Sequence, residues 1–333
     1  MTASHRPPVP VVDEKERTAA TKFAADVQYY LTQSPRQLPS RYLYDALGSA
    51  LFEAICLLPW YRVTRAEERL LAAHGRDVLR RVAPLSTIVE LGSGSGEKLR
   101  TLIAARDGEA VPLDVHLVDL SPSALAASAR ALQSIDRLHV TLHRASYEEG
   151  LSEIGERLDA EARALVLFLG SNIGNYDPPG ASALLRGIGS QLRPGDALLL
   201  GIDLVKAPRE LLLAYDDPLG VTAAFNRNLL IRINRELGGD FAVDQFAHQA
   251  VWNGDESRIE MHLVCQSPQR IHVEAAGITF AMQPGERIWT ESSYKYRSED
   301  ITTLIENAGF RPIAQWLDCA DQFALTLVEI AAS

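Results

Sequence analysis

The alternation of short apolar runs with helical stretches between residues 85 and 205 restricts the fold of this chain more than any other feature. Strands that alternate with helices predict a parallel sheet covered by helices on both faces. Two of the runs, "ALVLFLG" and "ALLLGI", are apolar almost throughout, as in strands buried on both sides. We expect strands at residues 87–91, 115–120, 140–143, 164–169 and 197–202, with helices that begin near Glu97, Ser123, Glu148 and Gly180.

The alternation stops after residue 204, which indicates a second structural unit. Periodicity predicts helical structure at residues 207–239, strands within 250–290, a helix at 298–309 and final strands at 312–317 and 323–330; helices are also expected early, at 14–31, 44–57 and 65–82. We therefore expect an α/β domain formed by residues 66–204 and 296–333, interrupted by an α+β domain formed by residues 15–65 and 205–295.

Charge, cysteines and the N-terminus limit the possible partners and compartment. The 333 residues carry a net charge of −10, which repels phosphate backbones, so nucleic acid is not an expected partner. Cys56, Cys265 and Cys319 are far apart, which suits reduced thiols better than a disulfide framework or a zinc site. The N-terminal "MTASHRPPVPVVDEKER" lacks the apolar core of a signal peptide, and no run approaches the ~20 apolar residues of a membrane span. We expect a cytoplasmic protein with no membrane partner.

The stretch "VELGSGSGEKLR", residues 89–100, places three glycines between the first strand of the alternation and a helix. A Walker A loop would need Lys followed by Ser or Thr after Gly96, where this chain has Glu97 and then Lys98. A dinucleotide loop, G-x-G-x-x-G, would need glycine at position 97, and the Glu97 carboxylate would repel a pyrophosphate. The loop better suits a nucleoside that carries an amino acid, such as S-adenosylmethionine, although an ordinary tight turn is the alternative.

Two further features favour S-adenosylmethionine over a nicotinamide cofactor. Asp119 ends the next strand, in "VHLVDLS", where a carboxylate can accept both ribose hydroxyls. Many S-adenosylmethionine-dependent methyltransferases insert a last antiparallel strand into the sheet, and "FALTLVEI" is a candidate for that strand. A dehydrogenase, the alternative, would not need this ending. We expect an α/β fold with a Rossmann-like, doubly wound methyltransferase sheet whose last strand is antiparallel.

Several polar residues beyond the strands are candidates for substrate binding. In "FLGSNIGNYDPPG", Asp177 before two prolines most simply starts a helix, although it is similar to the Asp-Pro-Pro-Tyr of DNA amino-methyltransferases. The amide of Asn175 can bind both an amine and a carboxylate, or Asn175 can be a turn residue. Asp216 and Asp217 could hold a metal, but no third ligand is evident, so a helix cap or turn is favoured.

The segment "WTESSYKY" has a carboxylate and a hydroxyl two residues apart. If the segment is a strand, Glu291 and Ser293 lie on one face, and Thr290, Ser292 and Tyr294 lie on the other. A carboxylate beside a hydroxyl matches a ring that has two nitrogens. A polar, solvated strand face is the alternative.

Several of these segments together resemble the histidine Nα-methyltransferases of ergothioneine biosynthesis, from about Leu31 to the C-terminus. The segments are "YLYDALGSALFEAICLLPWYRVTRAEERLL", "VELGSGSGEK", "FLGSNIGN", "GIDLVKAPRELLLAYDDPLGVTAAFNRN", "RIEMHL" and "TESSYKY". The resemblance implies a monomer with a methyltransferase fold that a family-specific domain interrupts. It also implies conversion of L-histidine to its trimethyl betaine, hercynine, with three molecules of S-adenosylmethionine and no metal.

The resemblance also implies roles for single residues. S-adenosylmethionine would be contacted by Tyr44, Gly92, Lys98, Asp119, Ser146 and Tyr147. Tyr61 and Asn175 would be the catalytic residues that hold the substrate amine, and Asn175 and Tyr215 would hold its carboxylate. The remaining substrate-binding residues would be Met261, Glu291, Ser292 and Ser293, of which Glu291 and Ser293 grip the imidazole.

The chain departs from the family pattern at two places. Ser146-Tyr147 stands where relatives often have Asp-Phe or Asp-Tyr against the adenine, and a hydroxyl is a weaker partner for the adenine amino group than a carboxylate. In "LPWYR", Arg62 replaces a second aromatic residue. A methyltransferase for the α-amine of another amino acid, or a non-catalytic protein that binds S-adenosylmethionine, are the remaining alternatives.

Overall fold

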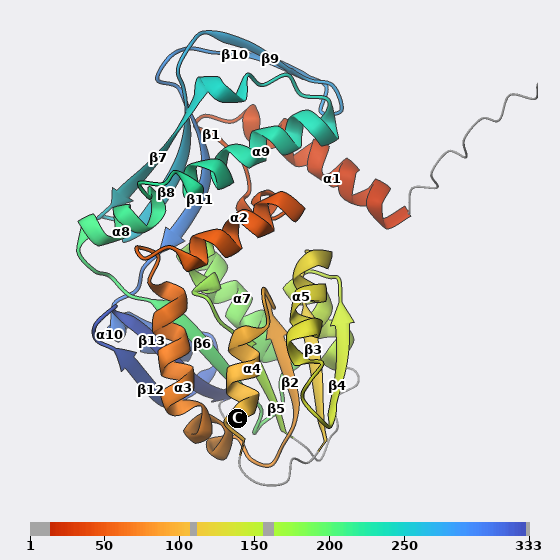
Figure 1. The fold of residues 1–333 in the computed structure, drawn as a ribbon, viewed down its shortest axis with the longest axis vertical. Helices are drawn as coiled ribbons and strands as arrows, with labels where there is room; N and C mark the ends of the chain where they lie inside the picture. Colours follow the sequence, from red (N-terminus) through yellow and green to blue (C-terminus); the bar gives the residue numbers. More distant parts are fainter. Residues whose placement is uncertain (1–13, 107–111, 156–162, 331–333) are drawn as a thin grey trace, which may run out of the picture.

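The computed structural model describes residues 14–106, 112–155 and 163–330 of the chain (Figure 1). The proline-rich lead, on which the expectation about a signal peptide rests, lies outside these residues. The described strands form a seven-stranded sheet, a four-stranded sheet and a two-stranded hairpin. Across the three described ranges, no helix is both long and apolar enough to cross a membrane.

The seven-stranded sheet has the order β12-β13-β6-β5-β2-β3-β4. Its strands are β2 (Leu85–Leu91), β3 (Leu113–Val118), β4 (Leu138–His143), β5 (Arg163–Phe168), β6 (Ala197–Asp203), β12 (Phe310–Asp318) and β13 (Phe323–Ile330). Strands β2 to β6 pair in parallel, and β13 runs antiparallel to both of its neighbours, β12 and β6. The predicted sheet with an antiparallel last strand is therefore confirmed.

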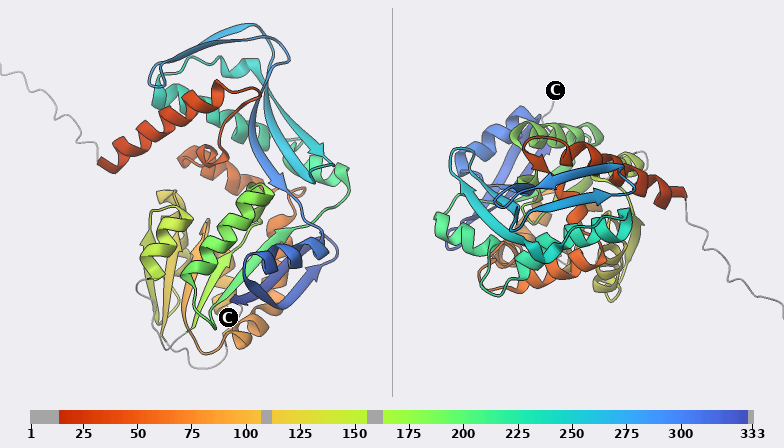
Figure 2. Two further views of the ribbon diagram at one scale, coloured as in Figure 1. Left: turned by 180° about the vertical axis from the view of Figure 1, so that it is seen from behind. Right: turned by 90° about the horizontal axis from the view of Figure 1, so that it is seen from above.

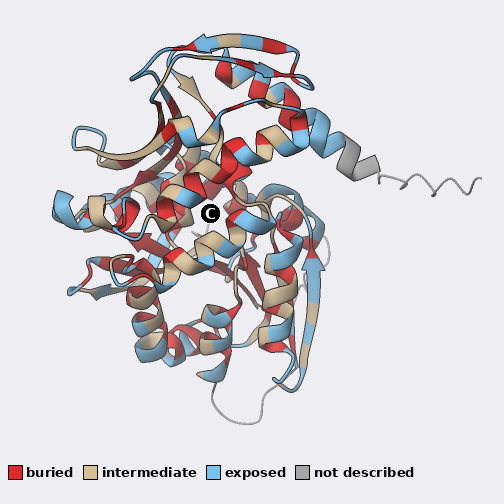
Figure 3. Ribbon diagram, turned by 45° about the horizontal axis from the view of Figure 1, so that its top comes forward, coloured by how far each residue is buried: buried red, intermediate tan, exposed pale blue. Residues whose placement is uncertain are grey.

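Helices cover both faces of this sheet (Figures 1 and 2). One face carries α3 (Val63–Arg81), α4 (Glu97–Ala104) and α5 (Pro122–Leu132), and the other carries α6 (Tyr147–Gly155), α7 (Pro178–Gln191) and α10 (Ser298–Asn307). Every residue of β6 is buried, as Figure 3 shows for the centre of the sheet, which explains why this strand is apolar from Ala197 to Ile202 rather than alternating.

The order of the strands creates a crevice where a ligand can bind. From β2 the chain moves outward through β3 to β4, then returns to the opposite side of β2 to form β5 and β6. Neighbouring connections therefore diverge at the carboxyl ends of β2 and β5, which is where open α/β sheets bind their ligands. The glycine stretch follows β2 and lies at this point.

The second sheet lies above the carboxyl ends of the first (Figure 1). It has the order β1-β11-β8-β7 and contains β1 (Arg36–Gln37), β7 (Phe246–Asn253), β8 (Arg258–Cys265) and β11 (Arg287–Tyr294); β9 (Gln269–Val273) and β10 (Ile278–Met282) form the hairpin. The helices next to the second sheet are α1 (Glu14–Leu31), α2 (Ala46–Leu57), α8 (Pro208–Tyr215) and α9 (Val221–Leu237). Three short helices also occur along the chain: η1 (Ser40–Leu43), η2 (Asn172–Asn175) and η3 (Val243–Gln245). Helix α2 packs on α9 and also contacts α5 of the lower sheet.

The helical stretch expected at residues 207–239 is two helices rather than one. It breaks between Tyr215 and Val221, where Pro218 and Gly220, with a positive φ of 74°, interrupt the run. The carboxylate of Asp217 accepts the N–H groups of Leu219 and Thr222 at 3.0 and 2.8 Å, so it caps α9. The prediction that Asp217 is a cap is confirmed, as is the helix start at Asp177, which accepts the Gly180 N–H at 2.8 Å.

Candidate active site

The loop after β2 has a backbone that only glycine adopts without strain. Gly92, Gly94 and Gly96 have φ values of 78°, 51° and 77°. A Cβ atom on Gly92 would lie 2.9 Å from Tyr147 Oη and from Asn172 Nδ2, and one on Gly96 would lie 2.7 Å from the Cα atom of Ser128. The glycines thus let the loop approach α5 and leave no side chain between the backbone and Tyr147 or Asn172.

Asp119 lies directly after β3, next to this loop. One of its carboxylate oxygens accepts the Ser121 N–H at 2.8 Å. Burial raises the pKa of Asp119, while the N–H groups of Ser121, Gly94 and Ser93 oppose that rise. A half-buried carboxylate at the end of this strand suits a ligand with paired hydroxyl donors, such as a ribose.

Glu90 is the last residue but one of β2, beneath the glycine loop, and is an unsatisfied buried acid. It is 3% exposed, and its Oε2 atom has no hydrogen-bond partner within the described part of the chain. Burial raises its pKa to about 8, although the positive charge of Lys98 opposes the shift. A buried carboxyl oxygen without a partner is costly, so this site fits a ligand that brings an N–H donor.

Lys98, at the start of α4, forms a buried ion pair with Glu67 of α3 at 2.5 Å. Both oxygens of Glu67 also lie 2.9 Å from the Gly170 N–H. Burial alone would lower the pKa of Lys98, but the adjacent Glu67 carboxylate raises it. The ammonium is therefore held at the carboxyl ends of β2 and β5, with N–H donors left for a ligand carboxylate.

Ser146 and Tyr147 begin α6, after β4. The Ser146 hydroxyl accepts the Glu149 N–H at 3.3 Å, and the Glu149 carboxylate accepts the Ser146 N–H at 3.1 Å, which is a capping box. Tyr147 packs edge-on against Phe168, with ring centroids 5.3 Å apart. This pair thus supplies a helix cap and an aromatic wall beside the glycine loop.

These groups together fit S-adenosylmethionine. The site suits a nucleoside with an amino-acid tail. The glycine loop leaves room for the ligand, Asp119 can accept ribose hydroxyls, Glu90 lacks a hydrogen-bond donor, and Lys98 can bind a carboxylate. The sequence pattern E-x-G-x-G-x-G includes Glu90 at the end of the strand, although the sequence assigned it no contact. Glu67 was not anticipated, because the charged surroundings of Glu67 in an amphipathic helix give no signal.

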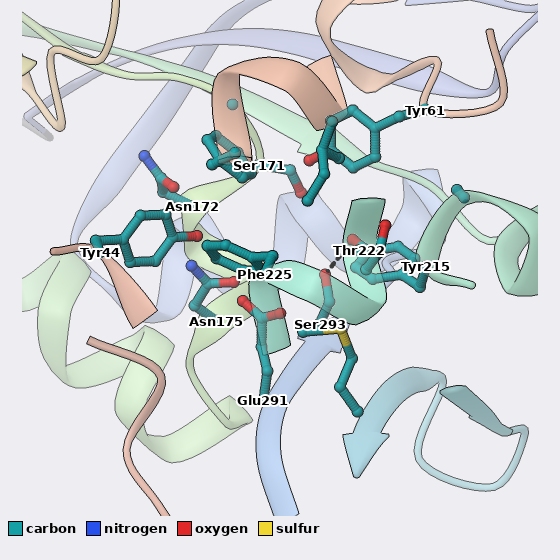
Figure 4. Close-up of a pocket in the computed structure, with 15 residues that line it drawn as sticks. Tyr44, Tyr61, Ser171, Asn172, Asn175, Tyr215, Thr222, Phe225, Glu291 and Ser293 are labelled. Carbon is teal, nitrogen blue, oxygen red and sulfur yellow. Dashed lines mark hydrogen bonds between the residues drawn. The ribbon is translucent and has the colours of Figure 1, made fainter. Parts of the chain in front are cut away.

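A cavity lies beside this site, between the two sheets (Figure 4). It is lined by Tyr44, Phe52, Ile55, Tyr61, Gly170, Ser171, Asn172, Asn175, Ala214, Tyr215, Thr222, Phe225, Met261, Glu291 and Ser293. Helix η2 contributes Asn175 from the lower sheet, and β11 contributes Glu291 and Ser293 from the upper one. The cavity thus brings together side chains from both sheets.

Glu291 and Ser293 face this cavity from one side of β11. Met261 is the register partner of Glu291 on β8 and also lines the cavity. Glu291 is 9% exposed, and burial raises its pKa to about 7, although Lys295 opposes the shift. The expected shared face of Glu291 and Ser293 is confirmed, and the solvated-face alternative is wrong because both side chains are buried.

Aromatic side chains line the other walls. Tyr61 precedes α3 and packs edge-on against Tyr215, with ring centroids 6.2 Å apart. Tyr44 packs in the same way against Phe52 and Phe225, at 5.5 and 5.4 Å. Burial raises the pKa of Tyr61 well above its ordinary value, so its phenol stays protonated and can donate or accept.

A buried polar network supports the cavity from behind. The Tyr215 and Ser293 hydroxyl oxygens are 2.8 Å apart, and Lys295 donates to both, at 2.8 and 2.9 Å. Lys295 also pairs with Asp203, at the end of β6, at 2.9 Å. Sequence reasoning assigned no role to Lys295 or Asp203, yet residues 291, 293 and 295 share the two-residue period of one strand face, which could have marked Lys295.

The structure groups the predicted site residues in two neighbouring places. Tyr61, Asn175, Tyr215, Met261, Glu291 and Ser293 line the cavity, together with Tyr44, which was expected at the cofactor. Gly92, Lys98, Asp119, Ser146 and Tyr147 lie along the carboxyl ends of β2, β3 and β4. Asn172, which was not predicted, lines the cavity and lies beside Gly92, so it joins the two places. Among the described residues that line the cavity, Ser292 does not occur.

Comparison with known proteins identifies relatives over nearly the whole chain. Residues 23–330 match the model of a family described as histidine-specific, S-adenosylmethionine-dependent methyltransferases. A histidine N-alpha-methyltransferase of Mycolicibacterium smegmatis is 41% identical over 93% of this chain and 95% of its own. One of Mycobacterium tuberculosis is 42% identical over 91% and 93%. Ergothioneine biosynthesis protein 1 of Neurospora crassa is 29% identical over 80% of this chain and 32% of its own.

Proposed function

The chain belongs to the histidine-specific, S-adenosylmethionine-dependent methyltransferases, and we propose that it trimethylates the α-amino group of L-histidine to give hercynine. S-adenosylmethionine supplies each methyl group from its sulfonium centre. The reaction serves ergothioneine biosynthesis, as the name of the Neurospora crassa relative states for that protein.

The observation that carries this proposal is the pair formed by Glu291 and Ser293 on one buried strand face. An imidazole has two ring nitrogens on opposite sides, and a carboxylate beside a hydroxyl offers a partner to each of them. Met261, paired with Glu291 across the sheet, gives the ring an apolar and polarisable contact. A phenyl or indole side chain would leave the buried Glu291 carboxyl without a partner, which disfavours those amino acids.

Tyr61 and Asn175 serve the amine. Methyl transfer is an in-line displacement, so it needs a neutral amine whose lone pair is held in the correct direction. The protonated phenol of Tyr61 and the amide of Asn175 can hold the amine, and Asn175 can donate its N–H to the substrate carboxylate. As N–H groups are lost with each transfer, the aromatic faces of Tyr44, Phe52 and Phe225 can stabilise the growing cation.

We propose that the two domains predicted from the sequence have separate roles. Residues 66–204 and 296–333 would form the methyltransferase domain, and residues 15–65 and 205–295 would form the substrate-binding domain. The enzyme would act as a cytoplasmic monomer on a small molecule and would need no metal, because displacement at a sulfonium requires no Lewis acid. The net charge of −10 supports a small-molecule substrate over nucleic acid.

Incubation of the protein with S-adenosylmethionine and a panel of amino acids, followed by mass spectrometry, tests the proposal. We expect histidine to gain three methyl groups and to be preferred over phenylalanine and tryptophan. Preferential methylation of another amino acid would overturn the histidine assignment. Binding of S-adenosylmethionine without methylation of any amino acid would indicate a non-catalytic binding protein.

A further inference from the structure

Lys295 is a fully buried lysine whose hydrogen-bonding capacity is used completely. Its ammonium nitrogen lies 2.8 Å from Tyr215 Oη, 2.9 Å from Ser293 Oγ and 2.9 Å from Asp203 Oδ2. An ammonium has three N–H donors, so each donor has one acceptor. Burial alone would lower the pKa of Lys295, but Asp203 and Tyr215 raise it, and the group stays charged.

Asp203 holds this ammonium in place from the lower sheet. Asp203 is the last residue of β6 and is buried. Its other carboxylate oxygen accepts a hydrogen bond from Lys206 at 2.6 Å, and its N–H donates to Ser171 at 3.0 Å. Lys295 is thus a fixed link between the end of β6 and the two hydroxyls that face the cavity.

The hydroxyls of Tyr215 and Ser293 have two hydrogens between them, and these can be counted. One hydrogen lies in the bond that joins the two oxygens, which are 2.8 Å apart. Lys295 only donates, so neither hydroxyl can direct its hydrogen toward that residue. One O–H therefore remains for a ligand. Because both oxygens accept hydrogen bonds from the charged Lys295, this O–H is a stronger donor.

We propose that Lys295 is the positioning residue of the substrate site: it fixes the Tyr215–Ser293 pair so that the pair offers one O–H donor to the amino acid. This inference rests on the proposed function. When Tyr215 donates to the substrate carboxylate, Ser293 donates to Tyr215 and must then accept a ring N–H. When Ser293 donates to a ring nitrogen, Tyr215 donates to Ser293, and the substrate carboxylate relies on Asn175.

Kinetic comparison of Lys295→Met with Lys206→Met tests this role. Both substitutions remove one lysine from Asp203, but only Lys295 touches the hydroxyl pair. We expect Lys295→Met to raise the KM for histidine about 10- to 100-fold, because two charge-assisted bonds that orient the hydroxyls are lost. The KM for S-adenosylmethionine should stay unchanged, and Lys206→Met should leave both KM values near those of the wild type.

A mutant cycle separates positioning from a general structural role. In a Tyr215→Phe/Ser293→Ala background the ammonium has no hydroxyl to hold, so adding Lys295→Met should not raise the KM for histidine further. An equal increase in both backgrounds, or an equal effect of Lys206→Met, would overturn the proposal. Lys295→Gln is the conservative variant: its amide can still donate to the hydroxyls, so its KM for histidine should lie between those of the wild type and Lys295→Met.

Failure of the proposed function gives a different result from failure of this inference. If the wild type methylates another amino acid rather than histidine, the histidine assignment is wrong. The same variants are then compared with that amino acid as acceptor, because its carboxylate would meet the same hydroxyl pair. An unchanged KM for the accepted amino acid in Lys295→Met would contradict the role of Lys295, as would either of the two outcomes named above.

Discussion

The protonation state of single buried carboxyls decides what this site can bind. Glu291 faces the cavity between the sheets with a pKa raised by burial to about 7, and Glu90 lies under the glycine loop with a pKa raised to about 8. Both groups therefore change charge near neutral pH, unlike an ordinary glutamate, which does so near 4.5. Each group can accept a ligand N–H when it is ionised and donates when it is protonated.

Glu291→Ala should move the preference of the enzyme away from histidine. The substitution removes a charge-assisted bond to a ring N–H, which costs roughly 2–4 kcal/mol, or about 30- to 1,000-fold in kcat/KM for histidine. Phenylalanine and tryptophan never use that bond, so their kcat/KM values should change little. The measurement compares the three amino acids for wild type and variant. An equal loss for all three would mean that Glu291 does not bind an imidazole.

Asp119→Ala should weaken binding of S-adenosylmethionine about 10- to 100-fold, because hydrogen bonds from the ribose to a charged acceptor are lost. Asp119→Asn is the matched control, since its amide oxygen can still accept the Ser121 N–H that Asp119 accepts at 2.8 Å. Titration calorimetry measures both variants, and circular dichroism verifies the fold. Unchanged affinity in Asp119→Ala would place the ribose elsewhere.

Glu90→Gln should stabilise the ligand-free protein at alkaline pH. The raised pKa of Glu90 means that the folded state binds the proton more tightly than the unfolded state. Its contribution to stability is therefore complete below about pH 4.5 and is lost as pH rises through about 8. Glutamine cannot ionise, so the Tm of Glu90→Gln relative to that of the wild type should rise from about pH 5 to about pH 8 and then stay constant. A Tm difference that is independent of pH would show that Glu90 is not the buried acid responsible.

At the scale of single elements, the start of α6 combines a structural and a binding role. The reciprocal bonds between Ser146 and Glu149 satisfy two N–H groups at the N-terminus of α6. The first residue of the helix, Tyr147, stands beside Gly92. The cap therefore fixes the aromatic wall near the glycine loop, where we propose that the adenine binds.

Two substitutions of Ser146 separate these roles. Ser146→Ala should lower the free energy of unfolding by about 1 kcal/mol, since the cap is lost. Ser146→Asp should preserve stability, because aspartate is an equally good N-cap and a negative charge is favourable at a helix N-terminus. It should also bind S-adenosylmethionine several-fold more tightly through a stronger acceptor for the adenine amino group. Denaturant unfolding and calorimetry measure the two effects, and weaker binding in Ser146→Asp would contradict this placement of the adenine.

The elements that sequence predicts well are those whose pattern is local. The range expected for the last strand coincides with β13, a mostly apolar run that follows the polar residues Asp321 and Gln322. Strand β1 was not predicted, since its two residues become a strand only by pairing with β11. The site follows the same rule: the glycine loop and the Glu291–Ser293 spacing are local signals. The bonds of Glu67 to Gly170 and of Lys295 to Asp203 join segments that are distant in sequence.

At the scale of the whole molecule, the two sheets share one apolar core. A single cluster of buried side chains runs from Phe225 and Phe246 of the upper sheet region to Leu167 and Leu327 of the lower sheet. The cavity lined by Glu291 and Ser293 lies between the sheets and takes side chains from both. Lys295 and Asp203 add a buried ion pair that joins β11 to β6. The two regions are therefore coupled through packing as well as through the site.

This coupling predicts one unfolding transition rather than two. Histidine with S-adenosylhomocysteine binds only the folded state, and at about 100 times the Kd a ligand adds about 2.7 kcal/mol of stability. Scanning calorimetry should show one peak that moves to higher temperature as a whole when both ligands are present. Two peaks, of which ligands shift only one, would show that the regions unfold independently.

The pairing of β1 with β11 determines when the N-terminal part of the chain can reach its final state during synthesis. Arg36 pairs with Ile288, which the ribosome adds 252 residues later. At roughly 5–20 residues per second, that interval lasts roughly 13–50 s. Helix α1, whose Val27 and Leu31 are buried, contacts β1 and α9, so its packing also depends on distant parts of the chain. The pairing of β1 is therefore completed late, although β1 itself is synthesised early.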